Sequence, residues 1–195
     1  MPGDAEGARR PALTDYVVWF DDALEPQFCA QLIASFEQTA HLQTNNGRGV
    51  RPGLERSGWT ELNVSRLADD GFKGFFLHQI DRHLALYNER VRLTIPVPAR
   101  PDIEDLRIKR YRVGADEQFQ PHFDSIDAVA NRYLVFLWYL NDVAAGGETE
   151  FCDLGLKVQA RAGRLLVFPP YWLFQHAGLP PRSNDKYILS TYLLF

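Results

Sequence analysis

Cysteines are scarce in this sequence, and it contains no long apolar segment and no run of basic residues. Its two cysteines, Cys29 and Cys152, stand too far apart to form a zinc motif or a disulfide framework, so we expect two small buried hydrophobic side chains. The net charge is −4, and without a basic run nucleic acid is not an expected partner. No stretch approaches the ~20 apolar residues of a membrane span. Residues 1–13 lack the apolar core of a signal peptide, so we expect a cytoplasmic protein without a membrane partner.

The overall composition is typical of one globular domain. The chain has 195 residues, of which 46% are hydrophobic and 13% aromatic, enough for a substantial core without disulfides or a structural metal. We predict a flexible tail over residues 1–13 and a single domain over residues 14–195. That domain would have a helical N-terminal part (14–100) and a β-rich part (101–195). Nothing in the sequence indicates the oligomeric state.

Helical periodicity is confined to the first half of the chain. Apolar residues recur every four positions in residues 26–39 and again in residues 67–91, which predicts two helices. A strand-like apolar run at residues 16–20 precedes the first of them. Residues 44–58 are rich in glycine and arginine and predict a mobile loop.

Short β-rich runs follow Pro101, and turn signals such as Asn141-Asp142 and Gly146-Gly147 separate them. This pattern is typical of a sheet sandwich or barrel. We therefore predict two N-terminal helices packed against a C-terminal core that is entirely β. The runs are residues 106–113, 133–140, 165–168 and 187–195.

The histidines divide into two groups. His41, His78 and His83 fall in the helical half, where we expect them at the surface or at the rim of a site. His122 and Asp124 are two positions apart in the β half, and on an extended segment this spacing places both side chains on one face. The alternative reading of this pair is an exposed strand end.

His176 supplies the other histidine of the β half. Together with His122 and Asp124 it would form a facial triad of two histidines and one carboxylate. Such a triad leaves metal positions open and suits a non-haem Fe(II) that must bind a co-substrate and O2.

Lys186 adds a second signal, ten residues after His176. It enters an apolar strand-like segment, and a lysine buried there needs an anionic partner. A dicarboxylate that reaches the metal at one end and Lys186 at the other would supply one. The alternative is a strand-end lysine that extends to solvent.

Several motifs together resemble the prolyl 4-hydroxylase-like branch of the Fe(II)- and 2-oxoglutarate-dependent dioxygenases. The resemblance runs from about Leu106 to the C-terminus, with a weaker echo in residues 16–36. In chain order, the matching segments are Tyr111-Arg112-Val113-Gly114, Phe119-Gln120-Pro121-His122-Phe123-Asp124, Tyr139-Leu140-Asn141-Asp142, Gly146-Gly147-Glu148-Thr149-Glu150-Phe151, His176-Ala177-Gly178-Leu179-Pro180 and Lys186-Tyr187.

The resemblance implies a fold and a cofactor set. The fold would be a double-stranded β-helix, a jelly-roll of the cupin-like kind, that holds Fe(II) at its mouth through His122, Asp124 and His176. 2-Oxoglutarate would be the co-substrate with O2, with ascorbate as a reductant. Lys186 would pair with the distal carboxylate of 2-oxoglutarate. Tyr139 and Tyr111 would donate hydrogen bonds to it and Thr149 would line its pocket, although all three could instead be plain strand residues.

The resemblance is weaker on the substrate side. Phe119 stands where the family usually has a tyrosine, Tyr192 where it commonly has a tryptophan, and two extra residues precede Phe119. Arg132 matches a position that contacts substrate in some relatives. We expect the substrate to enter near these three residues, beneath a lid formed by residues 44–58.

Three functions follow from the resemblance. The first is hydroxylation of an unactivated C–H, most directly in a prolyl residue of a peptide or protein, with release of succinate and CO2. The second is the same reaction on a free amino acid or another small metabolite. The third, which the complete triad and Lys186 disfavour, is a non-catalytic metal-binding sensor or interaction module.

Overall fold

Two antiparallel β-sheets face each other in the computed structural model, which describes residues 11–48, 52–98 and 102–195. The larger sheet has the strand order β1-β10-β7-β12-β5-β3-β2, and β4 pairs with β12. The smaller sheet has the order β6-β11-β8-β9. The strands are β1 (Val18–Phe20), β2 (Thr44–Asn46), β3 (Trp59–Asn63), β4 (Asp102–Ile103), β5 (Arg107–Tyr111), β6 (Phe119–His122), β7 (Arg132–Tyr139), β8 (Thr149–Phe151), β9 (Leu156–Val158), β10 (Leu165–Phe168), β11 (His176–Gly178) and β12 (Lys186–Leu194).

The larger sheet is buried on both faces. Along β7, Phe136 and Trp138 pack on one side with the helices, whereas Val135 and Tyr139 pack on the other side, against the smaller sheet. All four side chains are at most 1% exposed. Because side chains alternate along a strand, the same strand serves a structural core on one face and the interior of the barrel on the other.

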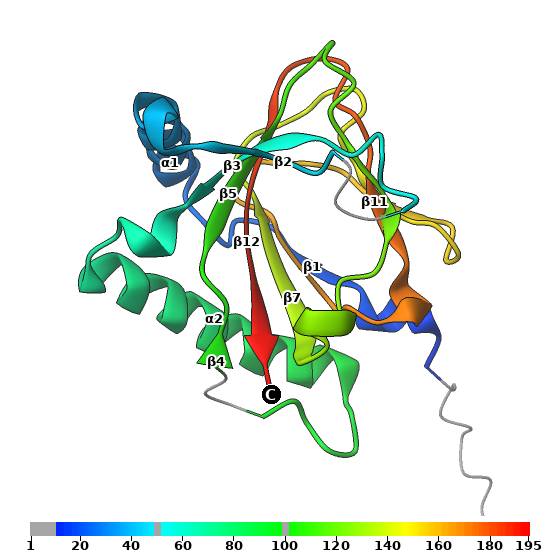
Figure 1. Ribbon diagram of the computed structural model, residues 1–195. Coiled ribbons are helices and arrows are strands. Elements are labelled where there is room, and N and C mark those ends of the chain that lie inside the picture. Colours follow the sequence, from blue (N-terminus) through cyan, green and yellow to red (C-terminus); the bar gives the residue numbers. More distant parts are fainter. Residues whose placement is uncertain (1–10, 49–51, 99–101) are drawn as a thin grey trace, which may run out of the picture.

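Two helices cover the outer face of the larger sheet (Figure 1). Helix α1 (Pro26–Gln38) begins with a proline, whose fixed φ suits the first turn, and helix α2 (Asp70–Val91) begins after Asp69, whose carboxylate accepts a hydrogen bond from Phe72 N at 2.8 Å. The two predicted helices are confirmed, and the cap at Asp69 explains why α2 starts later than its apolar pattern suggested. No helix of the described residues is long and apolar enough to cross a membrane. The remaining helical turns are short 3-10 segments: Leu13–Tyr16, Ala40–Leu42, Val64–Arg66, Asp127–Val129 and Trp172–Phe174.

The N-terminal half also contributes strands to the larger sheet. β1 pairs with β10, and β3 lies between β5 and β2. The loop predicted over residues 44–58 was therefore wrong at its start, because Thr44–Asn46 form β2; residues 49–51 lie outside the described chain. β2 escaped prediction because it is short and entirely polar, so its sequence has no apolar alternation.

Two side chains differ in burial from the sequence-based expectation. His83 is buried rather than at the surface, with Nδ1 2.8 Å from the carbonyl oxygen of Gln79 and its ring against Phe20. Cys152 is exposed rather than buried, whereas Cys29 lies in the core as expected. Neither deviation affects the interior of the barrel.

Candidate metal centre and co-substrate pocket

His122, Asp124 and His176 come together because two neighbouring strands present them. His122 ends β6 and His176 begins β11, and the register of the two antiparallel strands pairs these residues directly. Asp124 follows in a turn that is fixed when its backbone N–H donates to the carbonyl oxygen of Pro170 at 3.0 Å. The structure thus unites the three residues that the sequence singled out.

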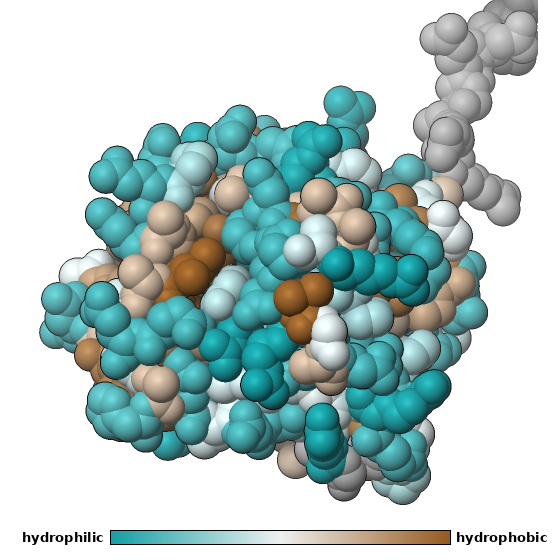
Figure 2. All heavy atoms as spheres, turned by 90° about the horizontal axis from the view of Figure 1, so that it is seen from above, coloured by the Kyte–Doolittle hydropathy of each residue, from teal (hydrophilic) through white to brown (hydrophobic). Residues whose placement is uncertain are grey.

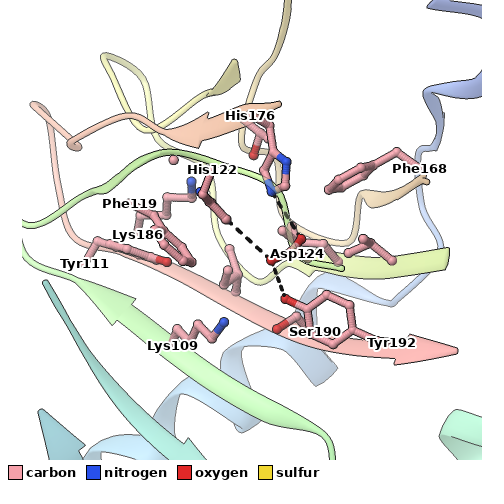
Figure 3. A pocket seen from close by; sticks show the side chains of 15 residues that line it. Lys109, Tyr111, Phe119, His122, Asp124, Phe168, His176, Lys186, Ser190 and Tyr192 are labelled. Atoms are coloured by element: carbon pink, nitrogen blue, oxygen red, sulfur yellow. Dashed lines mark hydrogen bonds and ion pairs between the residues drawn. The ribbon is translucent and has the colours of Figure 1, made fainter. Parts of the chain in front are cut away.

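The three side chains form a compact donor set (Figure 3). One ligand atom from each lies within 4.8 Å of the others. His122 Nε2 is 3.4 Å from Asp124 Oδ1, and His176 Nε2 is 3.3 Å from Asp124 Oδ2. All three side chains are less than 10% exposed. Two nitrogens and one oxygen at this spacing fit a divalent iron with open positions for further ligands.

Hydrogen bonds orient both imidazoles toward the centre of this set. Nδ1 of His122 lies 2.7 Å from the carbonyl oxygen of Gln120, and Nδ1 of His176 lies 3.0 Å from that of Phe174. A carbonyl oxygen accepts only, so Nδ1 carries the proton and the Nε2 lone pair is free to bind a metal.

Protonation states at the site suit metal binding. Burial lowers the pKa of His122, and the neighbouring His176 lowers it further. Burial alone would raise the pKa of Asp124, but the two imidazoles beside it hold that pKa well below its usual range. At neutral pH the site therefore offers an anionic carboxylate and a neutral His122, the forms in which these groups bind metal.

Arg132 and Tyr192, which we expect near the substrate, both contact Asp124. The Tyr192 hydroxyl donates to Asp124 Oδ1 at 3.1 Å, and Arg132 Nη1 donates to the Asp124 carbonyl oxygen at 3.3 Å. Arg132 also stacks 3.8 Å from the Tyr192 ring and forms a two-pronged ion pair with Glu104, at 2.9 and 2.6 Å. Their predicted contact with substrate stays a prediction, whereas their support of the carboxylate is direct.

We expect Tyr192→Phe to weaken Fe(II) binding by roughly tenfold to hundredfold, because it removes the hydrogen bond that orients Asp124. Anaerobic competition with a chelator measures the affinity. Tyr187→Phe is the matched control, since Tyr187 lies on the same strand but its hydroxyl bonds Glu37 on the outside of the sheet. Equal affinity of wild type and Tyr192→Phe would show that Arg132 and the turn suffice to hold Asp124.

A cavity inside the barrel begins at the triad and ends at Lys186. Lys186 starts β12 opposite Tyr111 of β5 and is only 2% exposed. Its ammonium lies 5.4 Å from the Tyr111 ring and 5.6 Å from the Tyr139 ring, and no residue in the described ranges accepts a hydrogen bond from it or pairs with it. Burial lowers the pKa of Lys186 to about 7. A buried cation without a partner fits a ligand that brings its own negative charge.

Tyr111 and Thr149 line the same cavity, and Tyr139 contacts two of its lining residues, Thr149 and Lys186. The Tyr139 hydroxyl donates to Thr149 Oγ1 at 2.6 Å. Burial raises the pKa of Tyr111 and of Tyr139, so both remain neutral hydrogen-bond donors. The structure places Tyr111 and Thr149 in the wall of this cavity and Tyr139 next to it, and the contact of all three with a co-substrate stays a prediction.

Beside the triad the cavity opens into a cleft of about 530 Å³. Asn46, Gly47 and Leu54 of the predicted lid segment form part of its wall, as does Phe119. Phe119 stacks on the His122 ring with ring centroids 3.4 Å apart, and Trp59 packs on Phe119 in turn. The end of the molecule seen from above is largely polar, with small separate apolar patches (Figure 2).

Sequence reasoning missed Lys109, which lines both the enclosed cavity and the open cleft. Lys109 is two residues before Tyr111 on β5, so alternation along the strand would have placed both side chains on one face. That signal was present in the run at residues 106–113 but did not identify which face lines the cavity.

Comparison with known proteins agrees with this geometry. Residues 106–194 match the family model of the 2OG-Fe(II) oxygenase superfamily. This part of the chain is similar to that superfamily. Prolyl 4-hydroxylase subunit alpha-1 of Homo sapiens and that of Gallus gallus are each 31% identical over 109 residues, which cover 46% of this chain. The chain aligns with about a fifth of the length of these relatives, 20% in each case.

Several solved structures share the fold of this chain. A prolyl hydroxylase of Trichoplax adhaerens, in complex with a hypoxia inducible factor peptide fragment, superposes with a TM-score of 0.72 at 15% identity, covering 93% of this chain and 84% of that one. A Pseudomonas putida prolyl-4-hydroxylase gives 0.66 at 19% identity, covering 92% and 93%. A viral collagen prolyl hydroxylase from Paramecium Bursaria Chlorella virus-1, bound to 2OG, gives 0.60 at 21% identity, covering 91% and 94%. The predicted double-stranded β-helix is confirmed.

Proposed function

We propose that the protein is an Fe(II)- and 2-oxoglutarate-dependent dioxygenase that hydroxylates an unactivated C–H of a prolyl substrate. One observation carries this proposal: the compact His122, Asp124 and His176 donor set shares a cavity with the buried, unpaired Lys186. The named relatives and structural neighbours, which are prolyl hydroxylases, support the substrate class.

In this proposal the triad holds iron and Lys186 holds the far carboxylate of 2-oxoglutarate. Iron and 2-oxoglutarate would supply the oxidising power for the hydroxylation, with O2 consumed and succinate and CO2 released. Tyr111 and Tyr139 would donate hydrogen bonds to this co-substrate, and Thr149, which accepts from the Tyr139 hydroxyl at 2.6 Å, would line its pocket. Phe119 and Trp59 form an aromatic wall that keeps water from the side of the site that faces the cleft.

Two kinds of substrate are compatible with the proposed reaction. A peptide or protein that contains proline agrees with the relatives, and a free amino acid or similar metabolite is the second candidate because a buried cation, Lys109, lines the cleft. Ascorbate as reductant and a cytoplasmic location stay predictions from the sequence.

A substrate screen tests the proposal. The purified protein with Fe(II), ascorbate and 2-oxoglutarate is offered proline-containing peptides and free amino acids, and succinate is measured together with products heavier by one oxygen atom. We expect both to appear for a prolyl substrate and to vanish in His176→Ala. Succinate without any oxygenated product across the screen would place the substrate outside the prolyl class.

A further inference from the structure

Lys109 is a second buried cation in the barrel, and it has no hydrogen-bond partner in the described part of the chain. It is 8% exposed, and its ammonium stands 5.4 Å over the Trp59 ring. Its cross-strand neighbour Glu61 attracts it electrostatically, but the Glu61 carboxylate accepts its hydrogen bonds from Trp59 Nε1 at 3.1 Å and Arg107 Nη1 at 2.6 Å. Among the described residues no acceptor lies within hydrogen-bond distance of the three N–H donors of Lys109, which is costly for a buried group.

The position of Lys109 links it to the reacting centre. Five residues line both the enclosed cavity and the open cleft, and they include Lys109, His122 and Asp124. In Figure 3 the side chain of Lys109 extends from β5 toward the side of the cavity where Asp124 and Tyr192 lie. A group held by Lys109 would thus sit on the substrate side of the iron, away from Lys186.

Charge balance separates the role of Lys109 from that of Lys186. Under the proposed function, the formal charges sum to zero over Fe(II), Asp124, Lys186 and doubly charged 2-oxoglutarate. Of the other charged groups along the cleft, Glu61 pairs with Arg107 at 2.6 Å and Glu104 with Arg132, also at 2.6 Å. Asp105 faces Arg66 at 3.9 Å on the outer rim. Glu61 is shared between Arg107 and Lys109, so these three groups keep one net positive charge and the loaded site has room for one further anion.

We propose that Lys109 binds a carboxylate of the substrate, and that the enzyme therefore acts on a prolyl-type residue with a free α-carboxylate: a free amino acid or the C-terminal residue of a peptide. This inference rests on the proposed function and narrows it. A prolyl residue inside a peptide is flanked by neutral amide groups and offers no charge so close to the reacting carbon. Trp59 and Phe119 line the same cleft and provide an apolar surface for the ring.

A matched pair of ligands tests this inference without turnover. The protein is loaded with Fe(II) and 2-oxoglutarate under argon, and calorimetry measures the binding of N-acetyl-L-proline and of N-acetyl-L-prolinamide, which differ only in charge. We expect the acid to bind roughly tenfold to hundredfold more tightly, as is usual for a hydrogen bond to a charged group. Lys109→Gln should abolish this preference, Lys109→Arg should keep part of it, and Lys157→Gln, which removes an exposed lysine, should leave it intact.

The other outcomes are equally decisive. The inference is contradicted if the wild type binds the acid and the amide with equal affinity, or if it binds neither of them. The same holds for a Lys109→Gln variant that loses affinity for 2-oxoglutarate and keeps the preference for the acid. If acetyl-Pro-Asp-amide binds as tightly as N-acetyl-L-proline, the carboxylate comes from a neighbouring acidic side chain and the α-carboxylate assignment is wrong. Failure of 2-oxoglutarate to bind the wild type at all would instead refute the proposed function.

Discussion

Replacing Asp124 with alanine should lower Fe(II)-dependent turnover by at least about a thousandfold, because it removes one of the three ligands that the described residues offer, and the anionic one among them. The two histidines that remain keep their hydrogen bonds to Gln120 and Phe174, so the pocket should keep its shape. Succinate release measures turnover, and anaerobic titration with a chelator measures how much Fe(II) the variant retains.

Two further variants separate loss of the ligand from loss of the fold. Asp153→Ala removes an exposed carboxylate outside the site and should behave as the wild type does. Asp124→Asn keeps the shape of the side chain but removes its charge, and it should also lose most of its turnover. An Asp124→Ala protein that is folded by circular dichroism and fully active would refute the assignment of Asp124 to iron.

Lys186→Met should weaken 2-oxoglutarate binding by about thirtyfold or more while making the ligand-free protein more stable. The loss follows because truncating one partner of a buried charge pair costs about 2–5 kcal/mol. The gain follows because Lys186 is 2% exposed and unpaired without ligand, so a neutral side chain removes a burial penalty of roughly 2–4 kcal/mol. Calorimetric affinity for 2-oxoglutarate and the melting temperature of the ligand-free protein measure the two effects, with Lys157→Met as control.

The pH dependence of both effects has a definite sign. Burial lowers the pKa of Lys186 to about 7 from 10.5, so the unfolded chain binds more protons than the folded one between these values. The stability of the ligand-free wild type therefore gains a contribution as pH rises from 7 to 10.5, and Lys186→Met should lack it. Affinity for 2-oxoglutarate should fall over the same range, because binding needs protonated Lys186, and should change little in Lys186→Arg. If Lys186→Met melts below the wild type at pH 7, Lys186 has a partner that stabilises the fold.

Sequence alone could predict the metal ligands and Lys186, because short segments of the chain carry the signals that identify them. His122 and Asp124 are two residues apart, and Lys186 stands at the start of an apolar strand, so both signals can be read without knowing which strands pair. His176 could be included because few histidines lie in the β half.

Residues whose roles depend on strand register could not be assigned in this way. The contacts of Arg132 with Glu104 and of Tyr192 with Asp124 bring together residues far apart in the chain, so the sequence could not show that both residues support Asp124. Lys109 was missed for a related reason, because the sequence does not show which face of β5 lines the cavity. Pairing across strands, rather than residue type, decides these roles.

Incubation under ¹⁸O2 tests the central claim most directly. The wild-type protein with Fe(II) and 2-oxoglutarate is exposed to ¹⁸O2, and the succinate is analysed by mass spectrometry; slow turnover without substrate suffices for this measurement. We expect succinate that carries one ¹⁸O atom, formed only when Fe(II) and 2-oxoglutarate are both present and absent in His176→Ala. Succinate without the label, or labelled succinate at an undiminished rate in His176→Ala, would contradict the assignment of this barrel as an iron- and 2-oxoglutarate-dependent dioxygenase.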